Sequence, residues 1–293
     1  MQAQPMDLPN PLPGDLEDQV AEALREDVAG GDVTASLVPA RQRVRGRVIT
    51  REPMVLCGVA WVEATFRALD PQIRLHWQLA EGAQACADDT LFTLEGPARP
   101  ILTGERTALN FLQLLSATAT EARRFADAVA GTGCTILDTR KTLPGLRTAQ
   151  KYAVRCGGAH NHRMGLYDMV LIKENHIAAA GSIAKAVASA RRLAPRLQVE
   201  TEVEDLEQLA EALRAAPDVV MLDNFSLADL RTAVDRTRAS GAAVKLEASG
   251  GTTLESVRAI AETGVDFISV GAITKHVRAI DLSMRLEFSA QDH

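Results

Sequence analysis

The sequence lacks several features that mark whole classes of protein. It contains no run of eighteen apolar residues, so it offers no membrane-spanning helix, and no charged segment leads into an apolar one at its start, so it offers no secretory signal. Basic residues are not in excess, since 32 Lys and Arg stand against 38 Asp and Glu, which argues against a general nucleic-acid binder. These absences predict a cytoplasmic protein that binds neither membranes nor nucleic acids.

Cysteine and aromatic residues are also sparse. The four cysteines, Cys57, Cys86, Cys134 and Cys156, lie far apart without a C-x-x-C pair, so neither a zinc knuckle nor a redox motif is indicated. We interpret them as reduced and mostly structural. Aromatic residues make up 4%, but the apolar fraction of 46% and charged fraction of 24% are ordinary for a globular protein and exclude disorder. A chain of 293 residues suits two modest domains.

The first part of the chain predicts an arm followed by an α/β sandwich. Four prolines within residues 1–14 indicate an extended arm. Helices are expected over Asp15–Asp27 and Val59–Leu69. Alternating apolar and polar residues predict strands that begin at Arg43, Met54, Ile73 and Thr90. We therefore predict a sandwich domain over residues 15–116, against which the C-terminal segment 275–293 packs.

A long helix is predicted from Thr103, because Leu109 and Leu112 begin a helical spacing of apolar residues. Thr103 is a suitable N-cap, which would place Arg106 in the first turn. A cation there opposes the helix dipole, so we expect Arg106 to meet an anion. The alternative is a surface arginine paired with Glu105.

Residues 117–274 alternate apolar strands with helices. Six strands are predicted to begin at Cys134, Met169, Leu197, Asp218, Ala243 and Asp266. The helices between them are predicted over Ile183–Leu193, Leu206–Ala215, Leu227–Ser240 and Thr253–Thr263. Repeated βα units predict a parallel sheet with helices outside, and six strands rather than eight predict an open (incomplete) α/β barrel. A doubly wound sheet is the alternative.

The segment 138–177 concentrates cations and imidazoles. Arg140, Lys141 and Lys173 follow two of the predicted strands, where a barrel places its site. The connection between these strands adds Arg147, Arg155, His160, His162 and Arg163. This density predicts a small target with several negative charges, although a solvated helix face is the alternative. The H-x-H of His160 and His162 does not indicate a zinc site, because Arg163 would repel a metal.

The later strands end in acids and then in glycines. Glu200, Glu202, Asp223 and Glu247 supply carboxylates that suit a divalent cation or sugar hydroxyls, or ion pairs with the lysines. Ser249-Gly250-Gly251 and Gly271-Ala272 each precede a helix, where free backbone N–H groups bind phosphate. One such turn is weak evidence, but two on neighbouring late strands match the usual phosphate position in barrels.

These motifs together resemble the quinolinate phosphoribosyltransferase family. The resemblance covers most of the chain and is carried by G-G-D-V-T, G-E-R-T-A-L-N-F-L-Q, D-T-R-K-T-L-P-G-L-R, H-N-H-R, L-I-K-E-N-H, V-E-T-E-V, L-D-N-F, E-A-S-G-G and I-S-V-G-A. It implies a type II phosphoribosyltransferase with the sandwich and open-barrel domains above, working as a dimer with Mg²⁺. The implied reaction joins quinolinate to phosphoribosyl pyrophosphate and gives nicotinate mononucleotide, pyrophosphate and CO₂ for NAD biosynthesis.

The resemblance also implies roles for individual residues. Quinolinate would be bound by Thr139, Arg140, His162, Arg163 and Lys173, with Arg106 from the partner subunit. Lys141, Glu202 and Asp223 would be the catalytic residues and would serve the ribose, the pyrophosphate and, directly or indirectly, the metal. The 5-phosphate would be held by Ser249, Gly250, Gly251, Val270, Gly271 and Ala272.

Three rival functions remain open from the sequence. A barrel aldolase would use Lys141 or Lys173 as a Schiff base, which requires a neutral lysine that the nearby acids disfavour. A sister transferase would act on another carboxylated base, although three cations suit two carboxylates better than one. A sensor would bind phosphoribosyl pyrophosphate without turning it over.

Overall fold

The structure, a computed structural model, describes residues 11–288 in two compact units. Most of the predicted arm and the last residues of the predicted C-terminal segment lie outside the described residues. Of the described residues, the first unit contains those from 11 to Arg123, Leu143–Gly158 and those from His276 to Phe288. The second contains Arg124–Thr142 and Ala159–Lys275. No helix in the part of the chain that the structure describes is long and apolar enough to cross a membrane.

The first unit is built on a four-stranded antiparallel sheet in the order β12-β1-β5-β3. Its strands are β1 (Arg43–Thr50), β3 (Arg74–Trp77), β5 (Thr90–Pro97) and β12 (Leu282–Phe288), and a small hairpin pairs β2 (Met54–Val55) with β4 (Gln84–Ala85). Side chains from alternate positions of β1 and β5, such as Val48 and Phe92, are buried against α2 (Val59–Leu69) and α3 (Ala98–Ala128). The alternation that predicted half-buried strands is therefore confirmed.

A second apolar cluster of the first unit joins its helices. Leu16 and Val20 of α1 (Leu16–Val28) pack with Trp61 of α2 and with Tyr152 of α4 (Arg147–Cys156). The rings of Trp61 and Tyr152 lie 5.4 Å apart. A short 3-10 helix, η1 (Ala35–Leu37), follows α1.

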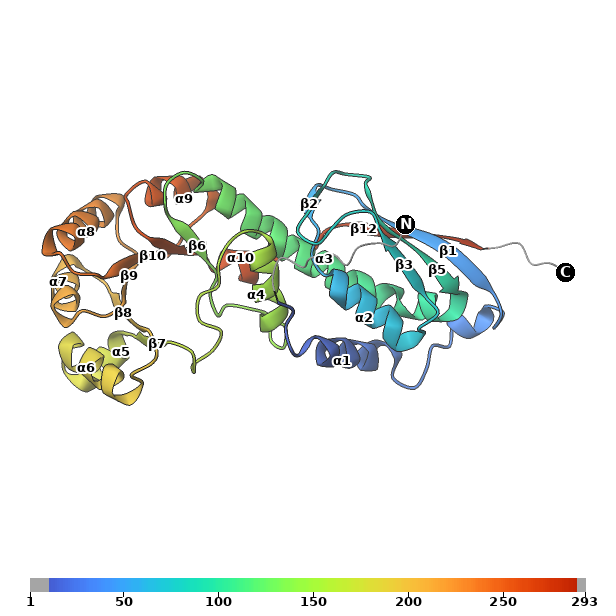
Figure 1. Ribbon diagram of the computed structural model, residues 1–293, viewed down its shortest axis with the longest axis horizontal. Helices are drawn as coiled ribbons and strands as arrows, with labels where there is room; N and C mark the ends of the chain where they lie inside the picture. Colours follow the sequence, from blue (N-terminus) through green and yellow to red (C-terminus); the bar gives the residue numbers. More distant parts are fainter. Residues whose placement is uncertain (1–10, 289–293) are drawn as a thin grey trace. The chain divides into compact units, whose positions relative to one another are not determined.

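The second unit is a six-stranded parallel sheet in the order β6-β11-β10-β9-β8-β7. The strands are β6 (Thr135–Leu137), β7 (Val170–Ile172), β8 (Val199–Val203), β9 (Val219–Asp223), β10 (Lys245–Ser249) and β11 (Phe267–Ser269). The helices are α5 (Glu174–Ala180), α6 (Ile183–Leu193), α7 (Leu206–Ala215), α8 (Leu227–Ser240), α9 (Leu254–Ala261) and α10 (Ala272–Lys275). Helices α6 to α9 lie on the outer side of the strands (Figure 1).

The barrel is open because its first two strands do not pair. Strands β6 and β7 are consecutive in the sequence, yet they occupy the two edges of the sheet. Beside β6, the sheet is extended only by a bridge between Leu137 and His160. The prediction of six parallel strands in an open barrel, rather than a doubly wound sheet, is confirmed.

Two helix predictions need correction. Helix α3 begins at Ala98, so Thr103 lies inside the helix, where its hydroxyl donates to the Arg99 carbonyl, and Arg106 is not in the first turn. The earlier start is compatible with Pro100, because proline is tolerated in the first turn, where its missing N–H would have no helical partner. Helix α4 was not predicted at all. It places Arg147 and Arg155 in the first unit, so the cations of segment 138–177 do not form one cluster within a unit.

The compact units also differ in their bounds from the predicted domains. The division falls at Arg123 rather than after residue 116, and Leu143–Gly158 joins the first unit although it lies within the predicted barrel segment. The physical reason is the apolar face of α4, whose Ala149, Tyr152 and Ala153 are fully buried among the helices of the first unit.

Candidate active site

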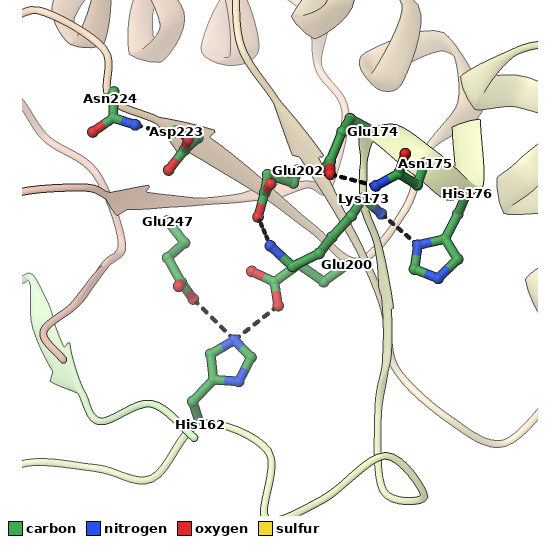
Figure 2. A network of polar contacts seen from close by, with 10 residues as sticks. All are labelled: His162, Lys173, Glu174, Asn175, His176, Glu200, Glu202, Asp223, Asn224 and Glu247. Carbon is green, nitrogen blue, oxygen red and sulfur yellow. Dashed lines mark hydrogen bonds and ion pairs between the residues drawn. The ribbon is translucent and has the colours of Figure 1, made fainter. Parts of the chain in front are cut away.

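The predicted site residues of the second unit follow the carboxyl ends of its strands. Thr139, Arg140 and Lys141 follow β6, Lys173 follows β7, Glu202 lies in β8, Asp223 ends β9, Ser249 ends β10, and Gly271 and Ala272 follow β11. Carboxyl ends of parallel strands meet at one edge of the sheet, which is where α/β barrels build their sites. Figure 2 shows that the side chains from β7, β8, β9 and β10 gather in one region of this unit.

Lys173 and Glu202 form the shortest ion pair of this region. Their Nζ and Oε2 atoms are 2.5 Å apart, and the Glu202 side chain is only 12% exposed. Lys173 is fixed by the start of α5, because its backbone N–H donates to His176 Nδ1 while the His176 N–H donates to the Lys173 carbonyl. The K-E-N-H motif thus orients the lysine toward Glu202. An ion pair of this kind stabilises the charged ammonium and does not favour the aldolase alternative.

His162 lies between two buried carboxylates. Its Nε2 is 2.9 Å from Glu200 Oε2 and 3.6 Å from Glu247 Oε2 (Figure 2). The backbone N–H of Arg163 donates to His162 Nδ1 at 2.8 Å. Because Nδ1 accepts this bond, a neutral His162 carries its proton on Nε2 and donates it to the carboxylates.

The surroundings of Glu200 and Glu247 favour the protonated form of these two carboxyl groups. Burial raises the pKa of Glu200 to about 7, and burial together with the charge of Glu200 raises the pKa of Glu247 to about 8. Oxygen Oε1 of each group is buried and has no hydrogen-bond partner among the described residues. Two carboxylates this close cannot both ionise easily, so the pair retains a proton near neutral pH.

This retained proton predicts the pH dependence of stability. The unfolded chain releases the proton above the ordinary glutamate pKa of 4.5, whereas the folded protein keeps it until about pH 8. The unfolded state therefore binds fewer protons between these values, and the free energy of unfolding should fall as the pH rises, by at most about 1.4 kcal/mol per pH unit for one proton. Glu247→Gln should flatten the fall in denaturant titrations from about pH 5 to about pH 8. Equal slopes for the wild type, Glu247→Gln and the exposed control Glu204→Gln would contradict this assignment.

Asp138 holds the segment that carries His162. It is fully buried at the end of β6 and accepts the His162 backbone N–H at 2.9 Å and the Asn161 amide at 2.6 Å. Sequence reasoning did not assign Asp138 or Asn161 a role. The signal was present, because Asp138 is an acid that directly follows an apolar strand.

Arg140 and Arg163 are close enough to influence each other. Burial, and then the positive charge of Arg140, lower the pKa of the Arg163 guanidinium from its ordinary value. Two neighbouring guanidinium groups repel each other and attract an anion with more than one negative charge. This arrangement supports the prediction of a multiply anionic target.

The first glycine-rich turn lies beside the acidic end of β9. The Asn224 backbone N–H donates to the Ser249 carbonyl, and Gly250 has a φ of 107°, a conformation that favours glycine. A Cβ at Gly250 would overlap the Asn224 side-chain oxygen. The turn therefore brings the predicted phosphate glycines next to Asp223.

Gly250→Ala should destabilise the protein by about 1–3 kcal/mol and raise the KM for a phosphorylated substrate, because backbone strain and the overlap with Asn224 displace the turn. Thermal unfolding and steady-state kinetics measure the two effects. Gly251→Ala is the matched control for stability, since its φ of 54° is less costly for other residues than 107° and nothing lies near its Cβ. A smaller loss for Gly250→Ala than for Gly251→Ala would contradict the prediction.

The second glycine-rich turn lies beside the predicted catalytic lysine. A Cβ at Gly271 would lie 3.0 Å from Lys141 Cδ and 3.5 Å from Thr139 Oγ1. The Thr139 hydroxyl oxygen accepts the Lys141 backbone N–H at 3.1 Å, and the Lys141 carbonyl accepts the Thr274 hydroxyl. The structure thus joins Gly271, which follows β11, to Thr139 and Lys141, which both follow β6.

Arg106 is the one predicted site residue that belongs to the first unit. It is exposed on α3, and the other predicted site residues belong to the second unit.

A cavity of about 590 Å³ reaches the buried carboxyl pair from the strand beginnings. Its lining includes Thr135, Val219 and Phe267, the first residues of three strands, as well as Glu200 and Glu247. The predicted site residues His162 and Arg163 also line this cavity, whereas the other cations and the glycines follow the carboxyl ends of the strands.

Comparison with known proteins decides the family. Residues 118–285 match the model of the quinolinate phosphoribosyl transferase C-terminal domain, and residues 32–116 match that of the N-terminal domain. The chain belongs to the quinolinate phosphoribosyltransferase family. The resemblance seen in the sequence motifs is therefore confirmed, as is the two-domain fold.

Individual members of the family resemble the chain over nearly their full length. The carboxylating nicotinate-nucleotide pyrophosphorylase of Mycobacterium leprae is 43% identical over 276 residues, covering 92% of this chain and 96% of that protein. A probable enzyme of the same name from Bacillus subtilis is 40% identical over 265 residues, covering 90% of this chain and 91% of that protein. The solved nicotinate-nucleotide pyrophosphorylase of Francisella tularensis is 48% identical, with a TM-score of 0.91, and covers 97% of this chain and 100% of that one.

Proposed function

We propose that this chain is a quinolinate phosphoribosyltransferase, a pentosyltransferase of NAD biosynthesis. It transfers the phosphoribosyl group of phosphoribosyl pyrophosphate to quinolinate and gives nicotinate mononucleotide, pyrophosphate and CO₂. The observation that carries the proposal is the division of the strand ends into cations, acids and glycine turns in a chain that matches both domains of the family.

Quinolinate binds through its two carboxylates. Arg140 and Arg163 offer two guanidinium groups that repel each other in the free protein, and Lys173 offers an ammonium group. His162, oriented by its carboxyl partners, and Thr139 complete the binding set, with Arg106 contributed by a second subunit. Three cations of this chain and one of a second subunit favour a dicarboxylate over a monocarboxylate.

Glu202 and Asp223 stabilise the ribose as its bond to pyrophosphate breaks. The anomeric carbon then becomes electron-poor, and fixed carboxylates stabilise its developing positive charge. Lys141 stabilises the negative charge of the leaving pyrophosphate, and the turns 249–251 and 270–272 hold the 5-phosphate through backbone N–H groups. The quinolinate nitrogen forms the new bond to the anomeric carbon.

Loss of CO₂ follows from the charge on the ring. Once the nitrogen is bonded to ribose it is cationic, and its positive charge stabilises the electron pair that stays on the adjacent ring carbon when the carboxylate departs as CO₂. That carbon then takes up one proton. The protein's task in this step is to hold the ring in position rather than to supply a nucleophile.

A magnesium ion fits the acidic strand ends. Glu202 and Asp223 lie on the neighbouring strands β8 and β9, and their carboxylate oxygens are the donor atoms that Mg²⁺ prefers. When bound with the substrate, the ion would offset the charge of the pyrophosphate group.

The protein acts as a homodimer, or a larger assembly of dimers, with shared sites. This proposal rests on the family resemblance, which implies that Arg106 reaches the site of the partner subunit. The cytoplasmic location stays a prediction from the sequence, which cell fractionation would test.

The deciding experiment compares quinolinate with nicotinate as the acceptor. Purified protein with Mg²⁺ and phosphoribosyl pyrophosphate should release pyrophosphate and CO₂ in equal amounts when quinolinate is present, and neither without it. Turnover with nicotinate alone would assign the chain to a sister transferase. Binding of phosphoribosyl pyrophosphate without turnover of either base would support the sensor.

A further inference from the structure

A polar cluster lies in the core of the first unit, where the proposed reaction has no use for it. Cys57 precedes α2, Glu81 lies between β3 and β4, and Cys156 is the last residue of α4. The two sulfur atoms and one carboxylate oxygen all lie within 4.8 Å of one another. Three segments far apart in the sequence thus bring together two thiols and a carboxylate.

These groups are removed from water almost completely. Cys57 is 0%, Cys156 4% and Glu81 8% exposed. Burial raises the pKa of the Cys57 thiol and of the Glu81 carboxyl group. Without a further partner, burial holds the Cys57 thiol as a neutral S–H group, which is unreactive toward oxidants.

The carboxylate of Glu81 is held in a fixed orientation. Its Oε1 accepts the Gly58 N–H at 2.9 Å and its Oε2 accepts the Val59 N–H at 3.1 Å, so it caps the start of α2. A carboxylate oxygen with one hydrogen bond keeps a second lone pair. The backbone of Cys57 is also fixed, because it both accepts from and donates to the Ser116 hydroxyl group.

Tyr152 points to an additional ligand in the cluster. Tyr152 is 0% exposed, and its hydroxyl group has no hydrogen-bond partner of ordinary geometry among the described residues. Burial, and then the neighbouring Glu81, Cys156 and Cys57 groups, raise the pKa of this hydroxyl group, which places it beside all three. A ligand held by these three groups therefore lies within reach of the Tyr152 hydroxyl oxygen.

We propose that Cys57, Glu81 and Cys156 bind a zinc ion, with the Tyr152 hydroxyl oxygen facing the fourth position. Two sulfur atoms and a carboxylate oxygen suit Zn²⁺, whereas Mg²⁺ and Ca²⁺ prefer oxygen alone. In a tetrahedral site with Zn–S bonds of about 2.3 Å, neighbouring ligand atoms lie about 3.5–3.8 Å apart, so the observed cluster must contract by about 1 Å at most.

Zinc binding exchanges protons for the metal. Zn²⁺ displaces the protons of the Cys57 and Cys156 thiols, two sulfur–zinc bonds form, and two protons leave to solvent without any change of oxidation state. Since the cluster is closed to water, the ion enters while the first unit folds, and it then links α4 to the start of α2 and to the loop that holds Glu81.

The test uses refolding of the whole chain with Co²⁺ in place of zinc. Wild-type protein should take up one Co²⁺ per chain in this site and show the near-ultraviolet thiolate-to-cobalt absorption and the visible bands of tetrahedral Co²⁺. Cys57→Ala and Cys156→Ala should lose these signals. Cys86→Ala and Cys134→Ala, which change an exposed and a half-buried thiol, should keep them.

The thiolate absorption also separates this site from the carboxylates of the second unit. Metal bound by His162, Glu200 and Glu247, which also lie within 4.8 Å of one another, has no sulfur ligand and gives no such band. Elemental analysis then gives the zinc content of protein that has been refolded in excess Zn²⁺ and dialysed extensively. The content of Cys57→Ala should be lower than that of the wild type by one zinc ion per chain. Circular dichroism reports whether the variants fold.

Two results would overturn the proposal. One is wild-type protein that refolds fully but shows no thiolate-to-cobalt absorption and holds less than about a tenth of an equivalent of sulfur-bound metal. The other is a thiolate signal that persists in Cys57→Ala and Cys156→Ala. A disulfide between Cys57 and Cys156 in place of bound metal would overturn the proposal in the same way as the first result.

Discussion

Glu202→Gln should lower kcat by about 10²–10³, because the amide cannot stabilise the positive charge that develops on the ribose. The effect has two parts in this structure. The carboxylate is lost from the end of β8, and Lys173 loses the oxygen that lies 2.5 Å from its ammonium group. The affinity for quinolinate should change much less than kcat, since the cations that bind the two carboxylates all remain.

Double-mutant kinetics separate these parts. Lys173→Met should mainly raise the KM for quinolinate, and the double variant should lose less than the product of the two single losses, because the residues are in contact. Glu204→Gln is the matched control, since Glu204 is an exposed acid just beyond the end of the same strand. If the losses of the two single variants multiply in the double variant, Glu202 does not act through its pair with Lys173. If Glu204→Gln loses as much activity as Glu202→Gln, Glu202 does not act specifically on the reacting ribose.

Mixed dimers of Arg106→Ala and Lys141→Ala subunits should regain activity that neither variant has alone. Each pure variant should be nearly inactive, because every site lacks one group. In a mixed dimer, one of the two sites combines an intact Lys141 with an intact Arg106 from the other chain. If half of the dimers are mixed, about one quarter of the wild-type activity returns.

The same experiment gives the opposite result if Arg106 acts within its own chain. If Arg106 served the site of its own chain, no site in a mixed dimer would hold both residues, and activity would stay at the level of the pure variants. Subunit exchange must be verified by mass differences between tagged chains. Mixtures of wild-type chains with chains that carry both substitutions serve as the reference. They show how much the activity changes through subunit exchange alone.

Much of the fold followed from local sequence patterns. The helices Val59–Leu69, Ile183–Leu193, Leu206–Ala215 and Leu227–Ser240 have the predicted bounds, because each has a continuous apolar stripe. Helix α4 was not predicted because Arg147, Lys151 and Arg155 interrupt its apolar residues. Arg147 and Arg155 were interpreted instead as anion-binding cations in a connection between two strands. The burial of α4 depends on α1, α2 and α3, which local sequence does not reveal.

The site was predictable as a set of residues but not as contacts. Strand ends gave the positions of Lys173, Glu202 and Asp223, because parallel strands deliver their ends to one edge. The position of His162 between Glu200 and Glu247 depends on the path of the segment anchored by Asp138. The pairing of Lys173 with Glu202 depends on how the start of α5 orients the lysine. Such long-range contacts carry no local periodicity.

The position of β12 in the sheet of the first unit has a consequence for synthesis on the ribosome. Strand β1 is made early, but its neighbour on one side, β12, is translated last among the described strands. Until then, the nascent chain exposes one edge of β1, an unpaired row of backbone groups of the kind that recruits other chains. We therefore expect newly made chains to depend on chaperones, and truncation before Leu282 to cause aggregation even though the second unit is complete.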